Sequence, residues 1–272
     1  MTAHRFDEKS VLVTGGSSGI GRAAVLAFAH EGAHVTAVGR DGARLAEVQA
    51  EAAAGVVETI AADLAAPGEA ERAVEAAIAR DGRLHVLVNC AGVALQETVL
   101  EATKEGWDLT MATNLTAVFF ASQTAARHMA AQGGGAIVNV ASIDALVADA
   151  PYAHYSISKA GVVMMTRAFA HELGHVGVRC NAVAPGVTRT PMTTGAISAK
   201  GSHAREIYDF NMGRIPLRRG ASAEEQAAVI LFLASEDASY VNGETVVVDG
   251  GQLAGYWYSP FDAPPVPRSD VP

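Results

Sequence analysis

The chain has 272 residues, 50% of them hydrophobic, which is enough to bury one large core without a second domain. Its formal net charge of -9 and the lack of a Lys/Arg-rich segment argue against a nucleic-acid-binding protein. Two cysteines, Cys90 and Cys180, lie in apolar runs, so we expect buried thiols in a reducing compartment and neither a disulfide nor a metal site.

Residues 1–9 are mostly polar and lack the apolar centre of a signal peptide. The sequence also contains no apolar run of the length that a membrane-spanning helix requires. We therefore expect a cytoplasmic protein that binds neither nucleic acid nor a membrane.

Short runs rich in β-branched residues alternate with longer segments of helical period, which is typical of β-α units that build a parallel sheet. The expected strands are residues 9–14, 34–39, 56–61, 84–90, 135–141, 177–183 and 244–249. The expected helices are residues 19–31, 42–54, 67–80, 103–131, 153–174 and 222–234. Ser222 and Glu225 have the spacing of a capping box at the last helix. The pattern predicts an α/β fold: a single-domain, Rossmann-type doubly wound sheet of about seven mainly parallel strands with helices on both faces.

Two segments interrupt this alternation. Residues 186–220 form a long connection, which we expect to cover a substrate at the carboxyl edge of the sheet. Residues 254–272 form a tail rich in proline and aromatic residues, either frayed or docked on the body or a neighbouring subunit. The sequence thus predicts a dinucleotide-binding catalytic domain over residues 1–253, followed by this tail.

The first strand leads into a glycine-rich turn that opens a helix. Glycine permits a sharp turn and a close approach to a pyrophosphate, and the start of the helix offers unpaired N–H groups. The residues expected to hold a dinucleotide here are Gly15, Ser17, Ser18, Gly19, Ile20 and Gly21. A turn that merely reverses the chain is the alternative, but the flanking strand and helix favour a dinucleotide site.

The spacing Thr-Gly-x-x-x-Gly-x-Gly over residues 14–21 resembles the short-chain dehydrogenase/reductase family. Further motifs of that family match in order and spacing, so that the resemblance covers residues 9–251. They are Asn89-Cys90-Ala91-Gly92, with cysteine in place of the family's second asparagine, then Asn114, Ser142, Tyr155 with Lys159, Pro185-Gly186-Val187-Thr188-Arg189-Thr190 and Val248-Asp249-Gly250-Gly251. The resemblance implies an oxidoreductase that interconverts a ketone or aldehyde and an alcohol with NAD(P)(H).

The expected catalytic group is the tetrad Asn114, Ser142, Tyr155 and Lys159. Tyrosine has a pKa of about 10, so it needs a neighbour that stabilises phenolate, and Lys159 shares its helix face four residues later. By resemblance, Lys159 also binds the nicotinamide ribose, Ser142 binds the substrate oxygen, and Asn114 holds a water in the proton relay. Taken singly, each residue has an ordinary structural role, such as a helix cap or a solvent-exposed lysine.

By the same resemblance, Asp144 and His154 border the substrate, with an ordinary solvent-exposed position as the alternative for each. Tyr152 also lies near Tyr155, but it has no lysine four residues later. Tyr155 is therefore the expected acid/base.

The end of the second strand indicates which nicotinamide cofactor is preferred. An acid there binds the ribose of NAD, whereas arginine accommodates the 2′-phosphate of NADP. Asp41 lies twenty residues after Gly21 and could be that acid, but we place it past the strand as a helix cap, so that Gly39 takes the usual position of the acid. Arg40 and Arg44 then favour NADP(H), with NAD(H) as the alternative.

Other cofactor contacts follow from the resemblance. The residues expected near the adenine or the nicotinamide are Asp63, Leu64, Asn89, Ala91, Gly92, Pro185, Gly186, Thr188 and Thr190. A turn or cap is an alternative role for Asp63. The hydroxyl of Thr188, where an aliphatic residue is more usual, is a candidate substrate contact.

The resemblance implies a homotetramer or homodimer that pairs through residues 103–131, residues 153–174 and the carboxyl-terminal strand. It also implies a small-molecule substrate. Residues 215–219 bear some likeness to β-ketoacyl carrier-protein reductases, which we keep as an alternative. Those enzymes tend to have basic residues near the positions of Gly133 and Val176 here. A catalytically idle dinucleotide sensor or scaffold on the same fold is the alternative from another class.

Overall fold

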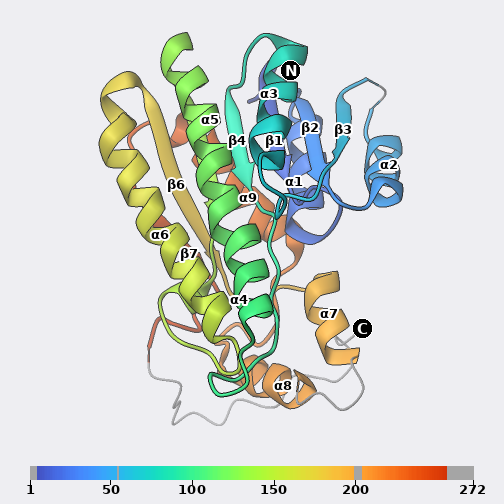
Figure 1. Cartoon of the computed structure of the whole chain (residues 1–272), viewed down its shortest axis with the longest axis vertical. Helices are drawn as coiled ribbons and strands as arrows, with labels where there is room; N and C mark the ends of the chain where they lie inside the picture. Colours follow the sequence, from blue (N-terminus) through green and yellow to red (C-terminus); the bar gives the residue numbers. More distant parts are fainter. Residues whose placement is uncertain (1–4, 54, 199–203, 256–272) are drawn as a thin grey trace.

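The centre of the fold is a seven-stranded sheet, seen in a computed structural model that describes residues 5–53, 55–198 and 204–255. Every strand pair is parallel, and the strand order is β3-β2-β1-β4-β5-β6-β7 (Figure 1). The strands are β1 (Ser10–Thr14), β2 (His34–Gly39), β3 (Val57–Ala61), β4 (Val86–Asn89), β5 (Gly135–Val140), β6 (Val178–Pro185) and β7 (Thr245–Val248). All seven expected strands are confirmed, with ends that differ by no more than two residues.

The direction in which the chain adds strands reverses at β1. Val11 of β1 pairs with Val35 of β2 on one side and with Val86 of β4 on the other. In doubly wound sheets such a reversal leaves a crevice at the carboxyl ends of the strands, where ligands bind. The topology therefore directs attention to the loops that follow β1 and β4.

Helices cover both faces of the sheet. They are α1 (Gly19–His30), α2 (Gly42–Glu51), α3 (Glu69–Asp81), α4 (Lys104–Met111), α5 (Ala117–Gln132), α6 (Ala153–Leu173), α7 (Pro191–Ser198), α8 (Ala204–Arg214) and α9 (Ala223–Ala234). The predicted capping box of α9 is present, since Ser222 N–H donates to Glu225 and Glu225 N–H donates to Ser222. In the described part of the chain, no helix combines the length and apolar character needed to cross a membrane.

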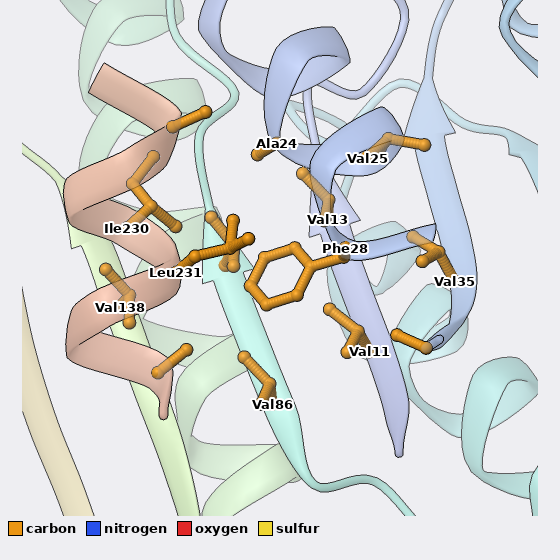
Figure 2. Packing of buried hydrophobic residues seen from close by; sticks show 14 of the residues in the cluster. Val11, Val13, Ala24, Val25, Phe28, Val35, Val86, Val138, Ile230 and Leu231 are labelled. Atoms are coloured by element: carbon orange, nitrogen blue, oxygen red, sulfur yellow. The ribbon is translucent and has the colours of Figure 1, made fainter. Parts of the chain in front are cut away.

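The core has one cluster on each face because side chains alternate along a strand. Val11 and Val13 of β1 pack with α1 and α9, where the fully buried Phe28 lies between the sheet and Ile230 and Leu231 (Figure 2). The intervening Leu12 packs on the opposite face with α3 and α5. Because hydrophobic residues fill both faces, the sheet is a rigid platform for the loops at its carboxyl edge.

Two parts of the chain differ from the sequence-based expectation. The single helix expected over residues 103–131 is divided into α4 and α5 by a π-helical turn, Ala112–Thr116. The connection 186–220 contains two helices, α7 and α8, which lie together at one end of the molecule (Figure 1). The tail residues 256–272, including Tyr256, Trp257, Tyr258 and Phe261, lie outside the described residues.

Candidate active site

Loops that follow all seven strands enclose a cavity of about 490 Å³ at the carboxyl edge of the sheet. Most of the predicted site residues line it. They are Gly15, Ser17, Ser18, Gly19, Ile20, Gly21, Arg40, Asp63, Leu64, Ala91, Gly92, Ser142, Tyr155, Lys159, Pro185, Gly186, Thr188 and Thr190. The fold thus gathers in one place residues that are up to 175 positions apart in the chain, from Gly15 to Thr190.

The glycine-rich turn leaves no room for side chains at two positions. Gly15 has φ +68°, and a Cβ there would lie 2.8 Å from the Ala91 Cα. A Cβ on Gly21 would collide with the Gly15 carbonyl oxygen. Ser18 precedes α1 without a side-chain cap, and the first turn of α1 has no acidic residue. The unpaired N–H groups and the positive end of the helix dipole therefore fit the pyrophosphate of a dinucleotide.

The end of β2 presents Gly39 and Arg40 to the same cavity. Asp41 caps α2, accepting hydrogen bonds from Ala43 N and Arg44 N at 3.1 Å each, as predicted. Arg44 does not line the cavity, and its Nε lies 3.3 Å from Asp41 Oδ2. Arg40 is therefore the guanidinium available to a ribose phosphate at this strand end.

Asn89 does not line the cavity, in contrast to Ala91 and Gly92. Its buried amide donates to Ser122 Oγ and to Asn139 Oδ1, both at 2.9 Å. The neighbouring loop is instead held by Thr14, whose Oγ1 accepts from Cys90 N at 3.0 Å and from Ala91 N at 3.2 Å. Asn89 thus contributes to the site indirectly, by fixing β4 against β5.

Asn114 also lies behind the cavity wall, in the π-helical turn. Its Oδ1 accepts from Val93 N at 2.8 Å and its Nδ2 donates to Val93 O at 2.9 Å and to Ser158 Oγ at 3.1 Å. A methyl group placed on Gly92 would lie 3.4 Å from Asn114 Oδ1 and 3.5 Å from Lys159 Nζ. The absence of a side chain at Gly92 therefore keeps a space that both polar groups border.

Tyr155 and Lys159 lie one turn apart on α6, as the spacing predicts. Lys159 is 4% exposed, its Nζ donates to Val140 O at 2.7 Å, and it lies 5.7 Å from the centre of the Tyr155 ring. Burial and the nearby Asp144 raise the pKa of Tyr155 more than the Ser142 side chain lowers it, so that the net shift is upward. In the protein alone, desolvation of the phenolate therefore sets the direction of the shift, and the lowering expected with Lys159 and a bound oxidised nicotinamide stays a prediction.

Burial changes the protonation of two neighbouring groups as well. It lowers the pKa of Lys159 to about 8, which leaves the ammonium mostly charged at neutral pH. Burial and the repulsion of Asp149 raise the pKa of Asp144 to about 6. Asp144 lines the cavity, and its N–H donates to Ser142 Oγ at 3.1 Å. At neutral pH the cavity wall therefore holds a protonated phenol, an ammonium and a carboxylate.

His154 lies in a place that the sequence did not indicate, and the Thr188 hydroxyl has hydrogen-bond partners within the protein. His154 is neither exposed nor in the cavity wall: it is 1% exposed, with Nε2 3.9 Å from Glu97 Oε2. The Thr188 hydroxyl donates to Gly186 O at 3.0 Å and accepts from Gln226 Nε2 at 3.3 Å. Because these internal partners occupy it, the suggestion that it contacts the substrate is not supported.

Several lining residues were not among the predicted ones. They include Tyr152 and Asp149 before α6, Ile207, Tyr208, Asn211 and Arg214 on α8, and Gln252 and Leu253 after β7. No motif marks the α8 residues, since the sequence assigned no helix there. Within the described residues, no group of His, Cys, Asp and Glu side chains has the arrangement of a metal site.

Comparison with known proteins identifies the class to which this site belongs. A family model described as enoyl-(acyl carrier protein) reductase matches residues 15–252. The 3-oxoacyl-(acyl-carrier-protein) reductase of Thermotoga maritima is 38% identical over 249 residues, 91% of this chain and 98% of that protein. The L-rhamnose 1-dehydrogenase (NAD(P)(+)) of Azotobacter vinelandii is 39% identical over 251 residues, 90% of this chain and 96% of that protein.

A solved structure agrees with these relatives. A protein of Beutenbergia cavernae, provisionally described as an NAD(P)-dependent gluconate 5-dehydrogenase and crystallised with NADP, has a TM-score of 0.86 and 36% identity, covering 93% of this chain and 100% of that chain. The chain belongs to the short-chain dehydrogenase/reductase family. It is an NAD(P)-dependent oxidoreductase that interconverts alcohols and carbonyl compounds.

Proposed function

We propose that the chain reduces a small ketone or aldehyde, or oxidises the corresponding alcohol, with Tyr155 as the acid/base and NADP(H) as the preferred cofactor. The observation that carries the proposal is that Tyr155, Ser142 and Lys159 line the same cavity as the glycine-rich turn. The residues that would hold the cofactor are those of this turn, Arg40 and Lys159. When bound, the cofactor supplies or accepts the hydride.

The side chains divide the remaining chemistry. In reduction, the Tyr155 hydroxyl donates its proton to the substrate oxygen, which Ser142 orients by a hydrogen bond. The raised pKa of Tyr155 keeps this proton in place at neutral pH. The Lys159 ammonium stabilises the phenolate that remains, and Asn114 borders the space through which a proton returns to it.

A panel of ketones and aldehydes tests whether the chain is an enzyme or a sensor. We expect the protein to consume NADPH with at least one member, as followed by the loss of its absorbance. Binding of NADPH without turnover of any member would instead favour the sensor or scaffold. Cofactor binding is therefore measured in parallel by fluorescence.

Arg40 supports the preference for NADP(H). It lines the cavity, and in the described residues it has no ion pair, whereas Arg44 lies beside Asp41. Arg40→Asp should weaken NADP binding by about 10- to 100-fold, because a phosphate contact becomes a repulsion, and should leave NAD binding equal or tighter. Arg44→Asp is the matched control. Equal affinities of the parent protein for NADP and NAD would contradict the proposed phosphate contact.

A 3-oxoacyl carrier-protein reductase is the second candidate, because the Thermotoga maritima relative has that activity in its name. Gly133 and Val176 provide no basic side chains for an acidic carrier, and the net charge of -9 disfavours docking of one. We expect kcat/KM for a small ketone to exceed that for a carrier-bound 3-oxoacyl thioester. A strong preference for the thioester would favour the second candidate.

We also propose that the chain is cytoplasmic and assembles as a homotetramer or homodimer through α4, α5 and α6. Large apolar side chains on these helices support the assembly, because solvent reaches them in the single chain. They are Trp107, Phe119, Phe120, Ile157 and Met164. The division into a domain over residues 1–253 and a tail over residues 254–272 remains part of this proposal.

A further inference from the structure

One face of α8 combines apolar and polar residues that line the cavity. Ile207, Tyr208, Asn211 and Arg214 follow the spacing of a single helical face, and all four line the cavity. Phe210, in contrast, is 60% exposed. A helix that covers a protein body normally turns its apolar residues inward and its charged residues outward. Arg214, one helical turn after the exposed Phe210, is therefore a charged residue at a position that lines the cavity, where a ligand can reach its charge.

Arg214 has no anionic partner within the described residues. Its Nε is buried without a hydrogen bond, and it takes part in no ion pair. The guanidinium carbon lies 5.3 Å from the centre of the Phe210 ring, a contact that restricts the guanidinium plane. Burying an arginine N–H without an acceptor is costly, so its position is explained best by an acceptor that enters the cavity.

Gln252 lies beside this face of α8 in a fixed position. The Asp249 carboxylate accepts hydrogen bonds from Gly251 N at 2.8 Å and from Leu253 N at 2.7 Å, which holds the turn around Gln252. Gln252 is 7% exposed, its Nε2 donates to Asn211 Oδ1 at 3.4 Å, and its Oε1 is buried without a partner. The side-chain amides of Asn211 and Gln252 thus line the same cavity as the unpaired guanidinium of Arg214.

We propose that Arg214, with Asn211 and Gln252, binds a carboxylate group of the substrate. The inference rests on the proposed function and names its substrate class: a ketone or alcohol that also carries a free carboxylate. The planar guanidinium presents two parallel N–H groups that match the two oxygens of a carboxylate. The Gln252 Oε1 then accepts from a substrate hydroxyl or from a cavity water.

The charges around the site favour a monoanion over a phosphate. Arg214 supplies one positive charge, and it stands in the last turn of α8, where the helix dipole is negative. Asp144 and Asp149 line the same cavity and repel a dianion more strongly than a carboxylate. The two other lining cations, Arg40 and Lys159, belong to the proposed cofactor and proton-transfer sites.

The test uses full-length protein with acetoacetate and levulinate, each paired with its uncharged methyl ester, and with acetonylphosphonate as the phosphate-like probe. The variants are Arg214→Met, which removes the charge, and Arg214→Lys, which keeps a charge without the planar fork. Arg205→Met is the matched control, because Arg205 lies on the exposed side of α8 and pairs with Asp209. Thermal melting shows whether each variant is folded.

We expect Arg214→Met to lower kcat/KM for the acids by about 100-fold, mainly through KM, and to leave the esters within about threefold. Arg214→Lys should lie between the two, and Arg205→Met should match the parent protein. NADPH affinity should be unchanged in every variant. Calorimetric titration of the NADPH-loaded protein should show the same loss of acid binding.

Four results would overturn the inference. They are equal losses for the acids and their esters, tighter Arg214-dependent binding of the phosphonate than of the acids, weaker NADPH binding by Arg214→Met, and no acid binding by the parent protein. The last result is read by calorimetry and so does not require turnover. Failure to turn over any compound would contradict the proposed function, whereas the titration would still decide whether Arg214 binds a carboxylate.

Discussion

Tyr155→Phe is expected to bind NADPH as the parent protein does and to lower kcat by about 1,000-fold or more. The substitution removes one oxygen atom from a side chain that α6 and the cavity wall otherwise hold in place. Ser142 can still bind the substrate oxygen, but the phenol that is placed to donate a proton to this oxygen is lost. The measurement is single-turnover consumption of NADPH, with cofactor affinity determined separately by fluorescence.

Tyr152→Phe is the matched comparison for this variant, since Tyr152 lines the same cavity and has its hydroxyl 2.6 Å from Gln96 Nε2. It also loses one phenolic oxygen, and we expect kcat to fall by no more than about fivefold, because another group supplies the proton. Comparable losses in the two variants would indicate a general effect on the cavity. A fully active Tyr155→Phe would refute the assigned acid/base.

Lys159→Met is expected to raise the melting temperature at pH 7 while it lowers turnover by about 100-fold or more. Burial lowers the pKa of Lys159 from 10.5 to about 8, so the unfolded chain binds this proton more tightly than the native protein. At pH 7 the buried charge therefore costs about 3 kcal/mol of stability. Loss of the hydrogen bond to Val140 O offsets about 1–2 kcal/mol of the gain.

The lowered pKa of Lys159 also predicts how the stability of the protein changes with pH, which gives a second measurement. Stability of the parent protein should rise between about pH 8 and pH 10.5, because over that range the native protein has released the proton and the unfolded chain still binds it. The advantage of Lys159→Met should therefore shrink as pH increases through this window. Lys104→Met, at an exposed lysine paired with Asp108, should show no such gain. A lower melting temperature of Lys159→Met at pH 7 would contradict the argument.

The sequence was a good guide to the parts of the site that depend on local order. The glycines of residues 14–21 predict the turn, because the backbone of this segment and of the loop after β4 approach too closely for side chains. The spacing of Tyr155 and Lys159 predicts that their side chains lie close together, because residues four apart share a helix face. The strand positions follow from runs of β-branched residues, and the capping box predicts the start of α9.

Other features depended on contacts between distant segments. Residues 103–131 were expected to form one helix. In the structure this helix is divided at Asn114, whose side chain forms two hydrogen bonds with the backbone of Val93, 21 residues away. Asn89 matched a cofactor motif, yet its amide bonds Asn139 on the neighbouring strand. Helical spacing places Lys159 beside Tyr155, but burial and Asp144, which depend on the folded protein, raise the Tyr155 pKa in the protein alone.

The sequence by itself determined the order of the strands and of most helices, the dinucleotide turn and the Tyr155–Lys159 pair, because periodicity, glycine and helical spacing act over a few residues. Only the tertiary structure decided which side chains the cavity receives. Arg214 carries no local sign of a role, since its importance comes from α8 lying over a cavity that Gln252, after β7, and the distant loops complete. The burial of such a side chain, and the hydrogen-bond and ionic partners that it meets, are decided only when distant segments fold together.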